Sequence, residues 1–337
     1  MYLPTHIEFI IVTIITTSIS FLISLIITPI FIKYLTLKGK LVNDKHKPNK
    51  PNIPRPGGPI LLACFVLSEL ILFFFTGFHE IIGIVITAII AFVIGIIDDF
   101  KTMPGWFKPT ALILAAIPLV IFHANENQLN IIFGNVYIPL LYIPLILIAI
   151  PLAGNTINSI DVFNGVATGF LIITMCPLLL STLLFGKIEF FLIELPFFAS
   201  LIGFYRFHKY PSRIFPGDSG TLLMGAIYGS FAIVSKSEII AIIALLPAIM
   251  NSFLFLSSVR KIVEHRQIKS RPIILKDDYS LEASKDKNAP ITLVRLILLD
   301  GPLSEKQIIN KIYKLGIFSS GLSFITIILQ YLILNIK

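Results

Sequence analysis

Residues 81–101 read IIGIVITAIIAFVIGIIDDFK. The apolar run over 81–97 approaches the roughly 20 residues that a helix needs to cross a hydrocarbon core, and it leads directly into Asp98 and Asp99. Carboxylates are costly beside such a run, and at the C-terminal end of a helix they oppose the helix dipole. The stretch predicts a membrane helix that ends at a carboxylate pair compensated by Mg²⁺ or by a nearby lysine, with a solvated helix end as the alternative.

The composition of the whole chain points to the same class of protein. Of its 337 residues, 55% are hydrophobic and 14% are charged, whereas an ordinary soluble chain has about 25% charged residues. Apolar runs near spanning length cover approximately 7–33, 57–77, 81–97, 109–124, 136–153, 165–184, 188–205, 217–234, 237–258 and 312–335. We therefore expect an all-α, polytopic integral membrane protein with about ten transmembrane helices in one domain over 1–337, rather than a soluble helical bundle.

The distribution of basic residues tests this layout. All but three of the 27 Lys and Arg residues lie in or beside the loops that follow the odd-numbered runs, and the exceptions are Lys187, Lys236 and Lys337. Positively charged loops stay in the cytoplasm, so these loops, including the long one over 259–311, are predicted to be cytoplasmic. The net charge of +8 thus reflects topology first and attraction to membrane lipids second. No nucleic-acid partner is predicted, because the basic residues form no reader motif.

A polar repeat marks the third of these loops. In GNTINSIDVFNG, residues 154–165, a carboxamide or carboxylate side chain recurs every third residue at Asn155, Asn158, Asp161 and Asn164. On a helix this spacing makes one slowly drifting polar face. Such a face suits hydrogen bonding between helices, and its oxygens equally suit a metal ion or a uracil-like base.

The fourth loop carries another acidic residue. In YPSRIFPGDSG, residues 210–220, Asp218 stands between Gly217 and Gly220 where the next apolar run begins. Small residues there allow backbone N–H groups at a helix start to approach an anion. Asp218 also lies at the same predicted depth as the 98–99 pair. The alternative is that Asp218 or Ser219 serves as an N-cap.

The fifth loop adds basic side chains. His265 and Arg266 belong to the stretch VEHRQIKSRP over 263–272, which suits phosphate binding but also suits a positive-inside flank. The five loops together offer carboxylates, amides and cations on one predicted face. That mixture is typical of a site that binds an anionic ligand through a metal.

These ordered motifs resemble the polyprenyl-phosphate N-acetylhexosamine-1-phosphate transferase family. GIIDDF is similar to the family's paired-aspartate motif, NTINSIDVFNG to its Asn-x-x-Asn segment and GDSG to its third acidic motif. Within the family, DDFKTMPGWFKPTALILAAIP, YPSRIFPGDSG, EHR and DGPLSE resemble the eukaryotic and archaeal UDP-GlcNAc:dolichyl-phosphate GlcNAc-1-phosphate transferases. The resemblance extends from the first loop to the last apolar run.

The resemblance implies a role for each matching position. Asn158 and Asp218 would be the metal ligands, for Mg²⁺ or alternatively Mn²⁺. Asp98, Asp99 and Lys108 would be catalytic, beside the acceptor phosphate. Asn164 and Phe215 would hold the uracil of the donor, and His265 and Arg266 would hold its sugar pyrophosphate.

The reaction implied by the resemblance is transfer of an N-acetylhexosamine 1-phosphate, with GlcNAc-1-phosphate favoured, from a UDP-sugar to a polyprenyl or dolichyl phosphate. UMP would leave, and the product would begin a lipid-linked oligosaccharide for protein N-glycosylation. A homodimer is compatible with the family. The enzyme would face the cytoplasm from the plasma membrane of a prokaryote or from the endoplasmic reticulum of a eukaryote.

Some positions depart from the eukaryotic type. Glu264 stands where those enzymes have the first basic residue of Arg–His–Arg, and Arg55 in IPRPGG stands where they have an acidic residue. Arg55 and Asp161 look bacterial, so a transferase that starts a cell-wall or surface polysaccharide is the alternative. A transporter is disfavoured because no internal repeat is visible. The intact acidic motifs disfavour a non-catalytic relative that only binds a partner.

Overall fold

The structure is a computed structural model that describes residues 6–47, 49–123, 128–261, 268 and 270–336. Its helices are α1 (His6–Leu37), α2 (Gly58–Thr76), α3 (His79–Phe100), α4 (Phe107–His123), α5 (Pro139–Ile160), α6 (Val166–Phe185), α7 (Ile188–His208), α8 (Gly217–Val234), α9 (Glu238–Val259), α10 (Leu293–Ile297) and α11 (Glu305–Ile336). Its strands are β1 (Leu41–Asn43), β2 (Asn52–Pro54), β3 (Gln128–Ile131), β4 (Gly134–Tyr137), β5 (Ile273–Leu275) and β6 (Leu281–Ala283).

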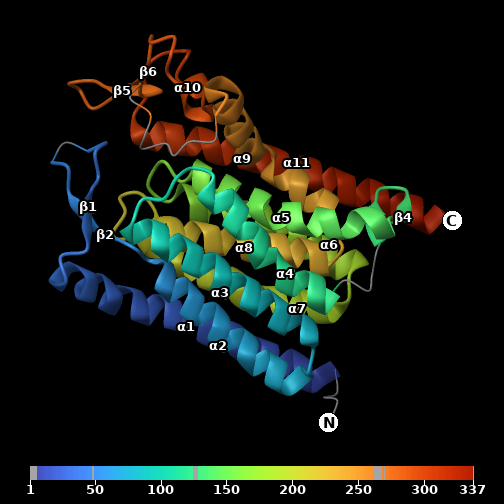
Figure 1. Cartoon of the computed structure of the whole chain (residues 1–337). Coiled ribbons are helices and arrows are strands. Elements are labelled where there is room, and N and C mark those ends of the chain that lie inside the picture. Colours follow the sequence, from blue (N-terminus) through green and yellow to red (C-terminus); the bar gives the residue numbers. More distant parts are fainter. Residues whose placement is uncertain (1–5, 48, 124–127, 262–267, 269, 337) are drawn as a thin grey trace.

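The long helices lie side by side in one bundle (Figure 1). The β1–β2 and β5–β6 hairpins lie at one end of the bundle, and the start of α1 and the end of α11 lie at the other end (Figure 1). The described parts of the five loops that follow odd-numbered spans meet at the end with the hairpins, as the distribution of basic residues predicts.

Eight helices are long and apolar enough to cross a membrane within the described part of the chain. All ten predicted runs coincide with helices, and the all-α polytopic class is confirmed. Of the helices that match the ten runs, two lie outside the group of eight, namely α4, whose apolar part is shorter, and α8. Every residue of α8 is buried. A helix that contacts protein on all sides needs less hydropathy than one that faces lipid.

Glycines let α8 pack closely against its neighbours α3 and α5. A Cβ atom on Gly95 of α3 would lie 2.4 Å from the Cα of Ser219, and one on Gly225 of α8 would lie 2.4 Å from the carbonyl oxygen of Ala153. Small residues of this kind permit close backbone approach between membrane helices. The contact at Gly95 brings the end of α3 against the start of α8, where the acidic motifs stand.

Gly95→Ala is expected to destabilise the bundle by about 1–3 kcal/mol, since the added methyl group meets backbone that cannot rotate away. The matched control is Gly321→Ala on α11, where an added Cβ meets nothing within 4 Å and alanine favours the helix by about 1 kcal/mol. Thermal unfolding in detergent should give a lower midpoint for Gly95→Ala only. Equal midpoints for the two variants would show that this approach is not tight.

Two boundaries differ from the sequence prediction. The fifth run was expected over 136–153, but the helix extends from Pro139 to Ile160, because Asn158 and Ser159 form hydrogen bonds with neighbouring helices. The last span was expected from 312, but α11 begins at Glu305. The long loop before it contains a hairpin and α10.

Candidate active site

Asp98 and Asp99 end α3 directly beside the first turn of α8. The two carboxylate oxygens of Asp99 accept hydrogen bonds from the backbone N–H groups of Asp218 (2.8 Å) and Ser219 (2.9 Å). Asp99 thus satisfies donors that a helix start leaves unpaired. The role of N-cap considered for Asp218 is therefore taken by a residue from another helix, and the Asp218 side chain contacts cations instead.

Two cations join the three carboxylates. Lys108, in the first turn of α4, places Nζ 2.9 Å from Asp98 and 3.2 Å from Asp218. Arg55, in the segment between β2 and α2, places Nη2 2.8 Å from Asp99 and 2.7 Å from Asp218. We call these five residues the charge cluster. It is largely buried, with Asp98 0% exposed.

The prediction that a nearby lysine offsets the charge of the carboxylate pair is confirmed, because Lys108 forms an ion pair with Asp98. Lys101, the other lysine close in sequence, is exposed, and Arg55 stands where the sequence had suggested no partner. Burial lowers the pKa of the Arg55 guanidinium, but the carboxylates of Asp218 and Asp99 outweigh burial and raise that pKa. The Arg55 charge is therefore fixed across the physiological pH range.

Asn158 lies on the face of α5 that meets α8. Its side-chain oxygen accepts a hydrogen bond of 2.7 Å from the hydroxyl of Thr221, which is one turn beyond Asp218. Carboxylate and amide oxygens are the ligands that Mg²⁺ prefers, so the donor set of Asp218 and Asn158 fits this ion. Both Asp218 oxygens face cations, however, and the described residues contain no group of three acidic, His or Cys side chains arranged to hold a metal.

The predicted polar face over 155–164 is interrupted. Helix α5 ends at Ile160, so Asp161 and Asn164 lie in the turn before α6 rather than on one helical face. Burial, opposed by a backbone hydrogen bond from Ala167 and by Arg55, raises the pKa of Asp161 to about 7. Nε2 of His208 lies 3.8 Å from Oδ1 of Asp161.

Asn164 joins three loops at the same end of the bundle. Its side-chain oxygen accepts from the backbone N–H of Ser212 (2.7 Å) and from Lys47, and its Nδ2 donates to Asp44 (3.0 Å). Its own backbone N–H donates to Glu305 (3.3 Å). This residue therefore fastens the first and fourth loops to the start of α11, and a role in holding uracil stays a prediction.

Phe215 lies in the fourth loop and is half-buried. Its ring stands edge-on to the ring of His208, with 6.5 Å between the centroids. Stacking of Phe215 on a uracil likewise stays a prediction. His265 and Arg266, expected to hold the sugar pyrophosphate, lie outside the described residues.

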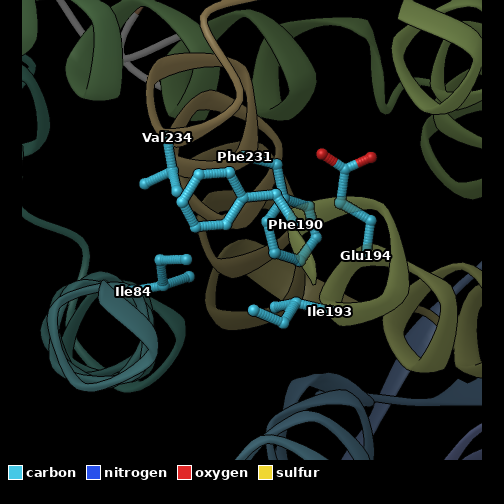
Figure 2. Close-up of a pocket in the computed structure, with 6 residues that line it drawn as sticks. All are labelled: Ile84, Phe190, Ile193, Glu194, Phe231 and Val234. Carbon is cyan, nitrogen blue, oxygen red and sulfur yellow. The ribbon is translucent and has the colours of Figure 1, made fainter. Parts of the chain in front are cut away.

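A small cavity occurs elsewhere, between α3, α7 and α8. Figure 2 shows its lining, which consists of Ile84, Phe190, Ile193, Glu194, Phe231 and Val234. It has no room for a water molecule, and the Glu194 carboxylate accepts a hydrogen bond of 2.9 Å from Thr182. A space so small and apolar offers no place for a polar substrate, so the charge cluster remains the candidate site.

Comparison with known proteins identifies the family of the chain. The model of Glycosyl transferase family 4 matches residues 81–236, which include the end of α3 and the start of α8. A protein of Methanocaldococcus jannaschii named a putative glycosyltransferase is 30% identical over 304 residues, covering 90% of this chain and 92% of that protein.

Two further relatives carry more specific names. One, from Saccharolobus solfataricus, is named a putative UDP-N-acetylglucosamine–dolichyl-phosphate N-acetylglucosaminephosphotransferase; it is 26% identical, over 86% of this chain and 89% of its own. The other, a phospho-N-acetylmuramoyl-pentapeptide-transferase of Caldicellulosiruptor bescii, is 28% identical over 68% of this chain and 77% of its own. Bundle, acidic motifs and relatives agree: this chain is a multi-pass membrane protein that belongs to glycosyl transferase family 4.

Proposed function

We propose that the protein transfers a sugar 1-phosphate from a UDP-sugar to a polyprenyl phosphate and releases UMP. The observation that carries this proposal is the charge cluster, in which two cations and three carboxylates meet at the end of apolar helices. Cations bind and orient phosphate oxygens, and the apolar helices suit an acceptor whose hydrocarbon chain stays in the bilayer. The name of the Saccharolobus relative supports the same pair of substrates, and the name of the Caldicellulosiruptor relative supports transfer of a phosphorylated amino sugar.

In the proposed reaction, an oxygen of the lipid phosphate attacks the β-phosphorus of the UDP-sugar. The bond between that phosphorus and the oxygen bridging it to the α-phosphorus breaks, and UMP leaves with the bridging oxygen. Asp98 and Asp99 repel the acceptor phosphate unless cations hold it, and Lys108 stands between Asp98 and Asp218 where it can do so. Asn164, Phe215, His265 and Arg266 are proposed to bind the donor.

We also propose that the reaction requires Mg²⁺, for which Mn²⁺ can substitute. Asp218 and Asn158 would hold the ion, which when bound would offset negative charge on the transferring group. The site is proposed to face the cytoplasm, because the loops that surround it carry nearly all the basic residues.

The donor sugar is proposed to be N-acetylglucosamine, in the first step of lipid-linked oligosaccharide synthesis for protein N-glycosylation. The Saccharolobus relative supports this choice because it covers more of this chain than the Caldicellulosiruptor relative. The second candidate is a bacterial-type donor for a cell-wall or surface polysaccharide, which Arg55 and Asp161 favour.

A donor screen tests the choice. Purified protein in lipid nanodiscs is incubated with Mg²⁺, dolichyl or undecaprenyl phosphate and one of UDP-GlcNAc, UDP-GalNAc or UDP-N-acetylmuramoyl-pentapeptide. We expect lipid-linked product mainly from UDP-GlcNAc. Product mainly from the muramoyl-pentapeptide donor would replace the first candidate by the second.

A further inference from the structure

Arg55 is the most exposed member of the charge cluster. Its side chain is 24% exposed, whereas the side chains of Lys108, Asp99 and Asp218 are 5%, 1% and 8% exposed. A single nitrogen of Arg55, Nη2, contacts both Asp99 and Asp218. Arg55 can therefore leave its carboxylates for solvent, whereas the more deeply buried Lys108 has far less access to solvent.

The backbone around Arg55 is fixed, so only the side chain needs to move. The N–H of Phe215 donates to the carbonyl of Pro54 (2.9 Å), and the N–H of Gly57 donates to the carbonyl of Phe215 (2.8 Å). The N–H of Arg55 itself donates to the carbonyl of Lys40 (3.1 Å). These bonds on both sides of Arg55 hold it in front of α8.

The formal charges of the cluster are unequal. Its three carboxylates carry one more charge than Arg55 and Lys108 neutralise. A divalent cation in the place of the Arg55 guanidinium would balance the carboxylates together with Lys108. The same ion added beside Arg55 would leave an excess of positive charge, and uncompensated charge is costly where water is excluded.

The guanidinium also occupies the position that a metal ion bound to Asp218 would need. Oδ2 of Asp218 is bonded to Arg55, and Oδ1 faces Lys108. Asn158, the other proposed ligand, is held on the adjacent helix by Thr221. A cation that binds Asp218 from the exposed side must therefore displace Arg55.

We infer that Arg55 and a divalent cation compete for Asp218. Arg55 acts as a built-in counter-ion that keeps the carboxylates paired in the metal-free protein and releases Asp218 when the cation binds. Arg55 is thus a positioning residue that sets the cation affinity of the site. The inference rests on the divalent-cation requirement of the proposed function. It assigns a role to a residue at which this chain differs from the eukaryotic enzymes.

Binding of Mn²⁺ alone, followed by electron paramagnetic resonance of the purified protein in nanodiscs, tests the competition. We expect Arg55→Gln to lower the Kd for Mn²⁺ about tenfold. Arg55→Lys, which keeps the charge, should remain within about threefold of wild type. The matched control is Lys101→Gln, which removes an exposed charge at the same end of α3 and should leave the Kd within about twofold. Asp218→Asn should abolish the site in either background.

A second measurement uses the wild-type protein and does not depend on the folding of a variant. Phenylglyoxal labels accessible arginines, and mass spectrometry reports each site. Mg²⁺ should increase labelling of Arg55 several-fold and leave Arg295 unchanged, because Arg295 is held by backbone carbonyls of the long loop.

Equal or weaker Mn²⁺ binding by a folded Arg55→Gln variant would overturn the inference. So would unchanged Arg55 labelling with Mg²⁺, or the absence of any Mn²⁺ binding that depends on Asp218. Neither measurement contains a sugar nucleotide or a lipid phosphate. If Arg55 and the cation do not compete but the protein still transfers sugar 1-phosphate, only this inference is rejected. If they compete but no sugar 1-phosphate is transferred, the proposed function is rejected.

Discussion

Replacing Asp218 with asparagine is expected to lower the turnover number by about a hundredfold to a thousandfold, the effect typical of one preorganised electrostatic group in an active site. The substitution keeps the size of the side chain but removes its charge. Arg55 keeps Asp99 and Lys108 keeps Asp98 as partners, at 2.8 Å and 2.9 Å. The bundle should therefore unfold at nearly the same temperature as wild type.

The measurement is the initial rate of lipid-linked product formation, with thermal unfolding of the same preparations. Asp278→Asn is the matched control, because Asp278 lies between β5 and β6 and is exposed. It should leave both properties unchanged. A rate for Asp218→Asn within tenfold of wild type would remove Asp218 from the catalytic machinery.

Replacing Lys108 with glutamine is expected to damage both stability and activity. Asp98 is fully buried and would lose the cation at 2.9 Å, keeping only the backbone N–H of Met103 at 2.9 Å. Breaking a buried ion pair from one side typically costs about 3–5 kcal/mol. The unfolding midpoint should fall markedly, and product formation should fall by at least about a hundredfold.

A double variant separates these two effects. Asp98→Asn combined with Lys108→Gln removes both charges, so no unpaired carboxylate remains and most of the lost stability should return. Activity should stay low if Lys108 contacts the reacting phosphates. Recovery of both properties would assign Lys108 a purely structural role, and wild-type stability of Lys108→Gln alone would show that the pair contributes little.

Hydropathy and charge distribution could predict the bundle and the end at which the loops meet. The end of α5 could not be predicted in this way, because Asn158 and Ser159 are polar but bond within the protein. Hydropathy reports contact with lipid, so it underestimates the length of a membrane helix whose polar residues face other helices. The fully buried α8 is outside the group of lipid-length apolar helices for the same reason.

The three aspartates of the site could be predicted, but Arg55 could not. Arg55 lies 44 residues from Asp99 and 163 residues from Asp218 along the chain. Backbone hydrogen bonds between residues 54–58 and 215–216 bring it there, and backbone bonds leave no mark on residue types. The first loop is rich in basic residues, so in the sequence Arg55 looks like one more positive charge that keeps this loop on the cytoplasmic side. Its place two residues before the glycine pair Gly57 and Gly58, at the start of an apolar run, was the one available indication.

The nucleotide released during turnover tests the central claim most directly. Purified protein, Mg²⁺, polyprenyl phosphate and UDP-GlcNAc labelled in both uridine and sugar are incubated, and the products are separated by chromatography. Transfer of a sugar 1-phosphate predicts one UMP for each labelled lipid formed. Release of UDP would show transfer of the sugar alone, and release of neither nucleotide with any UDP-sugar would contradict the proposed reaction.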